Sequence, residues 1–209
     1  MRTRIKFCGV MTPAEAELAV ACGADAVGCI LAPSPRRIAL RDAVAIAATL
    51  PPFVTPVFVM VDPGERTLAD VSAACPAAIL QCAGDEDPEL LAPYGARILK
   101  VVHVGAESDA AAIEAACNRY ERGNVLLDTQ AGALRGGSGV RFVWDRARDI
   151  VRRRPTIVAG GLTPENVGDA IRTLRPYGVD VRSGIERNGR KDEGLMRAFQ
   201  AAVNDADRT

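Results

Sequence analysis

Short apolar runs rich in β-branched residues alternate along the chain with Ala-rich segments whose apolar positions recur on one helical face. The apolar runs predict strands at residues 4–8, 26–31, 54–61, 78–82, 98–102, 124–128, 156–159 and 179–182. Helices are predicted to begin near Pro13, Arg41, Leu68, Asp87, Asp109, Val143, Pro164 and Glu193. Thr12 and Thr163 each stand directly before a proline, which is the pattern of an N-cap followed by the first helical residue.

Strands that alternate with helices predict a parallel sheet. Eight such units in 209 residues favour a closed (β/α)8 barrel, a TIM barrel, that spans residues 1–209 as a single domain. An open doubly wound sheet is the alternative that the alternation alone leaves open. The longest irregular segment, Thr129 to Gly139, follows the sixth strand. We expect it to be a mobile loop at the C-terminal face, where barrel enzymes build their active sites.

Net charge and the lengths of the apolar runs indicate which classes of partner to expect. The chain has 26 Lys and Arg residues and 26 Asp and Glu residues, so its formal net charge is zero. A dedicated nucleic-acid binder would carry a basic excess, so no nucleic-acid partner is expected. The chain opens without the apolar stretch of a signal peptide and contains no run of about 18 apolar residues. We therefore expect a cytoplasmic protein that has no membrane partner.

Six cysteines and one histidine are present, and no two cysteines form a C-x-x-C pair. This spacing does not fit a zinc site, so no metal is expected. Most of the cysteines lie in apolar runs and are predicted to be small buried side chains in a reducing cytosol.

Two strand ends carry candidate catalytic groups. The first strand ends in Cys8, whose thiol would face the mouth of a barrel and could act as a general base if its pKa fell toward neutral. The alternative is a buried structural cysteine. The sixth strand ends in Asp128 after three apolar residues. Partial burial would raise the pKa of this carboxyl group and suit it to act as a general acid, whereas a loop-capping aspartate is the alternative.

Two glycine-bearing loops predict a phosphate site. Gly160 and Gly161 follow the seventh strand, and Ser183 and Gly184 follow the eighth. In many barrels these two loops bind a phosphate through backbone N–H groups and the N-terminus of a short helix. Glycine lets the backbone approach the ligand, and Ser183 adds a hydroxyl donor. Ordinary turn chemistry is the alternative.

These motifs occur in an order and spacing that resemble the phosphoribosylanthranilate isomerase family. The resemblance runs through nearly the whole chain and includes Lys6-Phe7-Cys8-Gly9, residues 23–28, Ser34-Pro35-Arg36, Leu127-Asp128, residues 136–139, Gly160-Gly161-Leu162, residues 164–167, residues 183–186 and Lys191-Asp192. It implies a (β/α)8 barrel that catalyses the Amadori rearrangement of N-(5-phosphoribosyl)anthranilate in tryptophan biosynthesis.

The resemblance also implies roles for single residues. Asp128 would protonate the furanose ring oxygen, and Cys8 would remove the C2 proton of the resulting Schiff base. Arg36 would contact the anthranilate end, because a guanidinium pairs well with a carboxylate; a solvated loop arginine is the alternative. The partner would be a small phosphorylated substrate, with no cofactor, and the protein would be a monomer or a homodimer.

Three positions depart from the family pattern: Ala83 stands where the family has histidine, Arg182 where it has a small or polar residue, and Val143 where it has aspartate. Arg182 would bind substrate if it faces the mouth. The first two departures leave open a related isomerase with a different aminosugar phosphate, or a catalytically silent phosphometabolite-binding barrel. Retention of Cys8 and Asp128 argues against the silent barrel. The lone His103, expected just past the fifth strand, would be either a solvated loop residue or a replacement for the missing histidine.

Overall fold

The computed structural model describes residues 2–105, 107–121, 123–129 and 137–209, without the side chains of residues 129 and 137–143. The barrel strands are β1 Arg4–Cys8, β2 Ala26–Ile30, β3 Thr55–Met60, β4 Ile79–Cys82, β5 Ile98–Val104, β6 Asn124–Thr129, β7 Thr156–Ala159 and β8 Gly178–Val181. The α-helices are α1 Pro13–Ala21, α2 Leu40–Thr49, α3 Glu65–Ala74, α4 Pro88–Leu91, α5 Ala110–Asn118, α6 Gly137–Arg153, α7 Val167–Leu174 and α8 Glu193–Asp207. The smaller elements are the 3-10 helices η1 Ala92–Arg97 and η3 Ser183–Ile185 and the paired strands β9 Glu186–Arg187 and β10 Arg190–Lys191.

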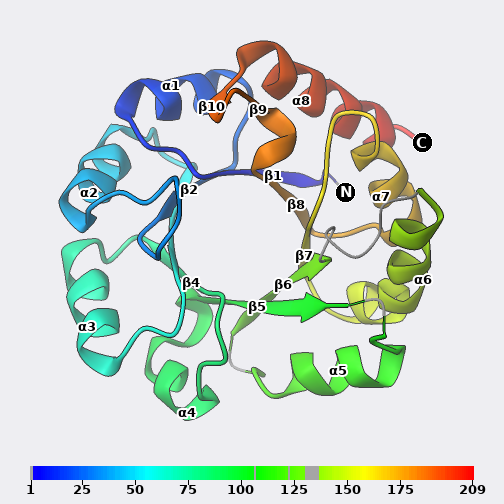
Figure 1. The fold of residues 1–209 in the computed structure, drawn as a ribbon, viewed down its shortest axis with the longest axis horizontal. Helices are drawn as coiled ribbons and strands as arrows, with labels where there is room; N and C mark the ends of the chain where they lie inside the picture. Colours follow the sequence, from blue (N-terminus) through cyan, green and yellow to red (C-terminus); the bar gives the residue numbers. More distant parts are fainter. Residues whose placement is uncertain (1, 106, 122, 130–136) are drawn as a thin grey trace.

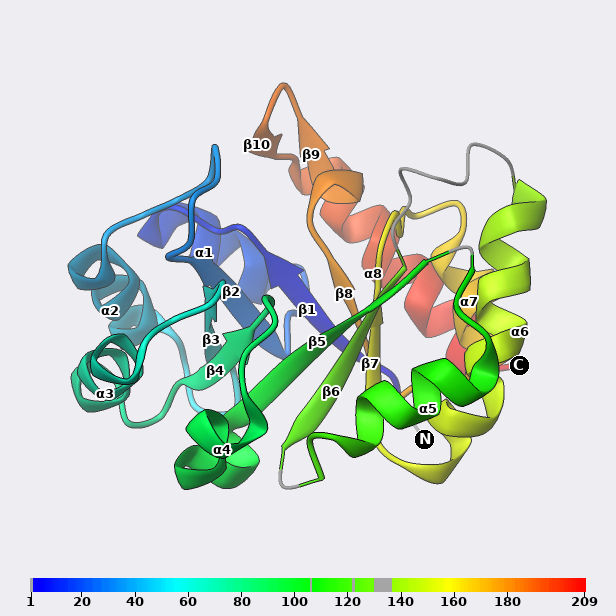
Figure 2. The same cartoon turned by 60° about the horizontal axis from the view of Figure 1, so that its bottom comes forward.

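The eight strands form a closed parallel barrel in chain order, which confirms the predicted fold and excludes the open sheet. Closure comes from the ladder between β1 and β8, in which Lys6 lies opposite Asp180. The α-helices surround the barrel as an outer ring (Figure 1). The β9–β10 hairpin projects beyond the carboxyl ends of the strands (Figure 2). This end of the barrel is therefore the one that carries the loops expected to build a site.

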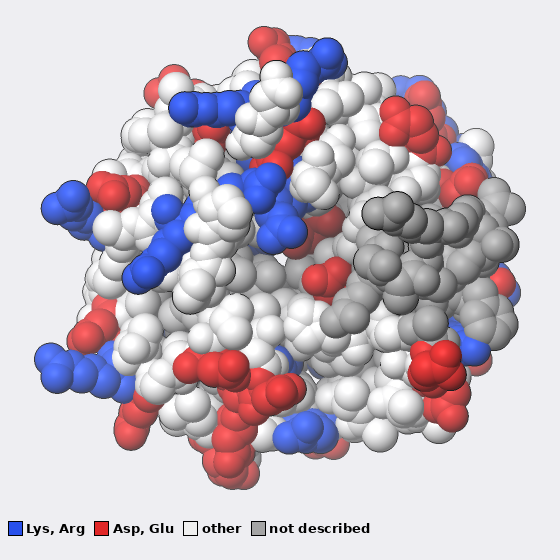
Figure 3. Space-filling view, in the orientation of Figure 1, with Lys and Arg blue, Asp and Glu red and all other residues white. Residues whose placement is uncertain are grey.

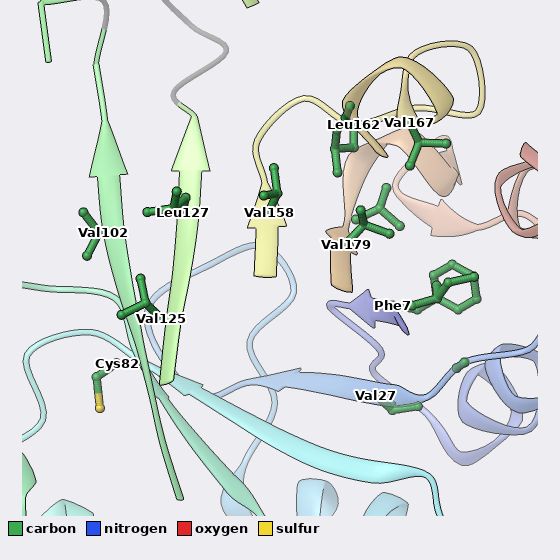
Figure 4. Packing of buried hydrophobic residues seen from close by; sticks show 14 of the residues in the cluster. Phe7, Val27, Cys82, Val102, Val125, Leu127, Val158, Leu162, Val167 and Val179 are labelled. Carbon is green, nitrogen blue, oxygen red and sulfur yellow. The ribbon is translucent and has the colours of Figure 1, made fainter. Parts of the chain in front are cut away.

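Alternation along each strand separates an inner from an outer set of side chains. The outer set packs against the helices; Phe7 of β1, for example, meets Phe199 of α8 with ring centroids 6.2 Å apart. Figure 4 shows outer residues of β5 to β8 standing on their strands within this layer. The inner set forms smaller clusters, one of which joins Leu99, Val101 and Leu126 inside the barrel. Residues two apart on a strand therefore lie on the same side of the barrel wall, and the inner set points into the interior.

Most predicted element starts lie close to the observed ones, with informative exceptions. Thr12 caps α1 as predicted, since its hydroxyl accepts a hydrogen bond from the Glu15 amide at 3.2 Å. The Thr163 prediction is wrong, because α7 begins only at Val167. The Asn166 side chain accepts from the Thr163 amide at 2.8 Å, so this segment forms a turn ahead of the helix. The helix predicted to begin near Val143 is α6, which starts at Gly137.

The expected mobile loop, Thr129 to Gly139, falls largely on residues 130–136, which lie outside the described part of the chain. The same holds for the side chain of Val143. Among the described residues, no helix combines the length and the apolar character needed to cross a bilayer.

A buried ion pair fixes the loops that follow β3 and β4. The Lys100 ammonium lies 2.8 Å from the Glu86 carboxylate, and both side chains are almost completely excluded from solvent. The other carboxylate oxygen of Glu86 accepts from the amides of Asp62 and Gly84 at 3.1 and 2.9 Å. The pair offsets part of the desolvation cost of its two charges by these hydrogen bonds. It thereby holds two neighbouring loops at the carboxyl end of the barrel.

Candidate active site

A cavity of about 760 Å³ opens at the carboxyl ends of the strands. Figure 3 shows this face hollowed at its centre, with acidic side chains in the hollow and basic ones beside it. The predicted site residues on its wall are Cys8, Asp128, Gly160, Gly161, Arg182 and Ser183. The volume lies within the usual range for small-molecule sites, about 300 to 1,000 Å³. Arg36 and Gly184 do not line the cavity, although Ser34 and Pro35 beside Arg36 do.

The floor of the cavity holds a buried ion pair between Lys6 and Asp180, for which the sequence motifs predict no role. The Lys6 ammonium lies 2.8 Å from an Asp180 carboxylate oxygen, and the two side chains are 3% and 9% exposed. Burial alone would lower the pKa of Lys6, but the negative charge of Asp180 and the nearby Cys8 outweigh it and raise that pKa. Lys6 is therefore held as a cation beside the thiol.

Gly28 of β2 makes this arrangement sterically feasible. It lies opposite Cys8 in the ladder between β1 and β2. A Cβ atom at Gly28 would come within 3.0 Å of both the Cys8 sulfur and the Lys6 nitrogen. A larger residue would push the two groups apart, so the bare backbone of Gly28 lets the thiol and the ammonium share one space.

The pKa of the Cys8 thiol differs from what a general base at neutral pH requires. Burial raises the pKa of the Cys8 thiol above its ordinary value, and the Lys6 cation offsets only part of that effect. The condition that this pKa fall toward neutral is therefore not met by the protein's own groups. The physical reason is that a thiolate loses more hydration on the cavity floor than one ammonium returns.

Asp128 meets the prediction made for it. Burial raises the pKa of its carboxyl group, and the neighbouring His103 acts in the opposite direction. The carboxyl side chain keeps 39% of its surface exposed at the mouth. Asp128 thus combines a proton retained to higher pH with direct access to a ligand in the cavity.

His103 lies inside β5, so its expected place in a loop beyond the strand is wrong. It is the ladder partner of Asp128. Its Nε2 lies 3.0 Å from the carbonyl oxygen of Ala83, and its Nδ1 lies 4.0 Å from an Asp128 carboxylate oxygen. Strand β5 extends two residues further than predicted, which turns this imidazole toward the cavity.

Arg36 belongs to a second charged cluster at the rim. Its guanidinium donates from Nε to Glu186 at 2.7 Å and from a second nitrogen to the other carboxylate oxygen. Lys191 pairs with the same carboxylate at 2.8 Å and also donates to the backbone carbonyl of Cys8. Burial favours protonation of Glu186, but these two cations outweigh it and lower the pKa of its carboxyl group. The β9–β10 hairpin is thereby tied to the end of β1.

Arg182 lines the cavity at the mouth, so the orientation required for a binding role is present. It shares the parity of Asp180 and follows the last residue of β8. A Cβ atom at Gly9 would lie 3.0 Å from the side chain of Arg36 and 3.4 Å from that of Arg182. The two guanidinium side chains therefore flank the end of β1.

The two glycine-bearing loops lie against each other. Gly160 and Gly161 adopt positive φ angles of 96° and 62°, where glycine avoids the strain of other residues. A Cβ atom at Gly184 would lie only 2.0 Å from the Leu162 carbonyl oxygen. Gly184 therefore allows the loop after β8 to pack on the loop after β7, which explains why it lies behind the cavity wall.

Gln81 of β4 is a functional candidate that the sequence motifs did not identify. It lies on the cavity wall with 5% of its surface exposed, and its side-chain oxygen has no hydrogen-bond partner among the described residues. Such a buried acceptor fits a ligand hydroxyl group. Signals for Gln81, Lys6 and Asp180 were present in the sequence, because each is a polar residue in the middle of an apolar strand.

The other cysteines are structural by position. Cys22, Cys29, Cys82 and Cys117 are buried and Cys75 is partly buried, which confirms the prediction for most of them. No group of three or more His, Cys, Asp or Glu side chains within the described ranges is arranged to hold a metal ion.

The fold and the site define a (β/α)8-barrel enzyme that carries one thiol and one carboxylic acid at its mouth. The family model for N-(5'-phosphoribosyl)anthranilate (PRA) isomerase matches residues 5–202, and the chain belongs to this family. N-(5'-phosphoribosyl)anthranilate isomerase from Moorella thermoacetica is 38% identical over 98% of this chain and 91% of that protein.

Solved structures of phosphoribosylanthranilate isomerases are also similar to this chain. The crystal structure of phosphoribosyl anthranilate isomerase from Thermotoga maritima is 36% identical and covers 97% of this chain and 99% of its own, with a TM-score of 0.85. A second structure describes the Thermotoga maritima isomerase as dimeric (32% identity, 97% and 99% covered, TM-score 0.82). A third isomerase structure contains reduced 1-(o-carboxyphenylamino)-1-deoxyribulose 5-phosphate (34% identity, 97% and 99% covered, TM-score 0.82).

Replacement of Lys6 tests the electrostatics of the cavity floor. In Lys6→Met the thiolate of Cys8 loses its cation, so the pKa of the thiol should rise further and alkylation of Cys8 by iodoacetamide should require a higher pH than in the wild type. Asp180→Asn is the matched opposite change: it removes a negative charge near the thiol and should move the same profile to lower pH. The measurement is peptide mapping of alkylated Cys8 across a pH series, with circular dichroism to verify folding. Profiles that shift in the same direction would contradict this account of Cys8.

Proposed function

We propose that this protein catalyses the Amadori rearrangement of N-(5-phosphoribosyl)anthranilate to the 1-deoxy-1-aminoketose phosphate of tryptophan biosynthesis. The observation that carries this proposal is the placement of Cys8 and Asp128 on one cavity wall, together with the loops after β7 and β8. Membership of the isomerase family supports the same reaction.

Asp128 acts first, as the general acid. Its raised pKa keeps a proton available for the furanose ring oxygen. As the ring C–O bond breaks, its electron pair goes to the oxygen, which takes the proton from Asp128. The anilino nitrogen supplies its lone pair to carbon and forms a cationic Schiff base. Asp128 is left as a carboxylate.

Cys8 then removes the C2 proton as the general base. Burial raises the pKa of Cys8, so the thiolate needed for this step is favourable only with positive charge beside it. The Lys6 cation stabilises that thiolate, and the positive Schiff base adds a second charge in its favour. Loss of the C2 proton gives an enolamine, which becomes the aminoketose when C1 gains a proton and the C2 hydroxyl loses one.

The two ends of the substrate are held by different groups. The phosphate binds between the loops after β7 and β8, where Gly160, Gly161 and Ser183 face the cavity, with Gly184 behind them and Arg182 alongside. A guanidinium beside a phosphate forms charge-assisted hydrogen bonds.

Arg36 binds the anthranilate carboxylate. Glu186 occupies two of its five N–H donors, which leaves the others to meet a ligand and fixes the plane of the guanidinium. Arg36 acts therefore as a pre-oriented donor and not as a solvated loop arginine.

Removal of the acid or the base should abolish most turnover. We expect Cys8→Ser and Asp128→Asn each to lower kcat by about 10² to 10⁴-fold with a much smaller change in KM, since neither group provides most of the binding energy. The assay follows the loss of fluorescence of N-(5-phosphoribosyl)anthranilate. Cys75→Ser and Asp85→Asn serve as matched controls that should keep wild-type rates. Near-wild-type kcat in Cys8→Ser or Asp128→Asn would remove that residue from the mechanism.

The phosphate site predicts a second kinetic signature. Inorganic phosphate should compete with the substrate, and in crystals an anion should lie between Gly161 and Ser183. Ser183→Ala should raise KM about two- to tenfold and leave kcat nearly unchanged, because one neutral hydrogen bond contributes about 0.5 to 1.5 kcal/mol. Ser108→Ala, which lies outside the cavity, is the control. An ordered anion found only elsewhere, together with an unchanged KM, would refute this assignment.

For the oligomeric state, we propose a homodimer formed through the opposite, N-terminal face. Phe53 precedes β3 on that face, is 100% exposed and has a φ of 73°. An exposed aromatic residue held in a strained backbone is costly unless a partner covers it. The same face contains a cavity of about 430 Å³ lined by barrel residues such as Val57, Ile79 and Leu99. In a two-fold dimer, the Phe53 side chain of each protomer could enter the cavity on this face of its partner.

The dimer is tested by Phe53→Asp. Burial of a phenylalanine contributes about 1.5 to 3 kcal/mol, so a charged residue at this position should dissociate the pair. Sedimentation at micromolar concentration should give twice the chain mass for the wild type and for Phe53→Leu, and a single chain mass for Phe53→Asp. A wild-type protein that sediments as one chain would contradict the proposal.

A further inference from the structure

The only histidine of the chain joins the ends of three neighbouring strands. His103 projects from β5, contacts the backbone of Ala83 at the end of β4 and faces Asp128 on β6. Its side chain is 42% exposed, so it reaches both the cavity and solvent. The small side chain of Ala83 leaves this end of β4 open to the ring of His103.

The contact with Ala83 determines the protonation pattern of the ring. A carbonyl oxygen only accepts hydrogen bonds, so the Nε2 atom at 3.0 Å must carry a proton and donate it. In the neutral ring Nδ1 then carries a lone pair, and this is the atom that points to Asp128. Its 4.0 Å separation from the carboxylate is long for a hydrogen bond, but such contacts commonly tighten when a ligand binds.

We propose that His103 relays protons between solvent and Asp128. This inference rests on the proposed function, in which Asp128 ends each ring opening as a carboxylate. His103 would therefore act through Asp128: of these two residues, only Asp128 touches the substrate.

The proton balance closes over one turnover. Asp128 gives its proton to the ring oxygen, and Cys8 gains one from C2, so the product complex holds a carboxylate and a thiol. A solvent proton binds Nδ1 of His103 to give the imidazolium, and Nδ1–H then passes that proton to Asp128. Cys8 returns one proton to solvent. The enzyme regains its starting state with no net gain of protons and no change in oxidation state.

The surroundings of Asp128 explain why a relay is useful. Burial makes the carboxylate unfavourable, so the group must regain its proton before the next substrate reacts. Among the other charged groups that act on Asp128, Asp180 favours the protonated carboxyl, whereas Lys6 and Arg182 favour the carboxylate. Lys6 and Asp180 are paired in the buried floor, and an arginine does not give up its proton, so they are poor carriers of solvent protons. The imidazole of His103 differs from these groups because it reaches solvent and the cavity at once.

The test separates proton transfer from hydrogen bonding. His103→Gln retains an amide N–H that can donate to the Ala83 carbonyl but cannot carry a proton to Asp128. His103→Ala removes both functions and leaves a space that free imidazole can enter. We expect both variants to lose at least about tenfold in kcat, with KM changed less than about threefold. Imidazole added to His103→Ala should restore kcat in proportion to its concentration, and it should have no effect on the wild type or on Asp128→Asn.

Each outcome assigns a role. Wild-type kcat in His103→Gln would overturn the relay and leave His103 a hydrogen-bond donor to β4. Loss of kcat in both variants without rescue by imidazole would also overturn it and assign His103 a structural role. Thermal unfolding of His103→Ala and His103→Gln monitors folding. A wild-type protein that does not turn over N-(5-phosphoribosyl)anthranilate would instead refute the proposed function, which is a separate result from an active wild type with active variants.

Discussion

The ion pair between Lys6 and Asp180 is the interaction on which the site depends. It spans β1 and β8, the two strands whose pairing closes the barrel, so the ends of the chain must meet in register before it can form. A buried pair of this kind is favoured only when its geometry is good, because both charges lose hydration. Here the pair also places a cation beside Cys8, and Gly28 provides the space for it. Barrel closure and the chemistry of the thiol are therefore coupled.

Further charged clusters connect the loops to this floor. The carboxylate of Glu186 joins Arg36 to Lys191, and Lys191 reaches the backbone of Cys8. On the other side of the barrel, Glu86 is bound by Lys100 and by the backbone of the loops after β3 and β4. These networks use charge to position loops that carry little apolar surface of their own. Loops held in this way favour the precise placement of catalytic groups.

The fold places Ala83 and Arg182, two of the residues that depart from the expected motifs, at the wall of the cavity. Ala83 and His103 are twenty residues apart in the chain, but their strands are neighbours and the imidazole contacts the Ala83 carbonyl. The imidazole of β5 thus covers the end of β4 next to Ala83. Arg182 is similarly placed by its strand, since it shares the inward parity of Asp180 and lines the cavity. Both departures change the groups on the wall of the cavity and leave the barrel itself intact.

The sequence by itself determined the eight strand–helix units and the strand-end positions of Cys8 and Asp128, because these follow from local periodicity and from which residue ends each strand. It favoured the closed barrel but left an open sheet possible, and only the ladder between β1 and β8 decided between them. The sequence did not determine the end of β5, where two further ladder pairs beyond Val102 placed His103 in the strand and on the cavity wall. Nor did it determine the partner of Arg36 or the raised pKa of Cys8. Those properties depend on contacts between residues far apart in the chain and on the water excluded by the closed barrel, so only the tertiary structure decides them.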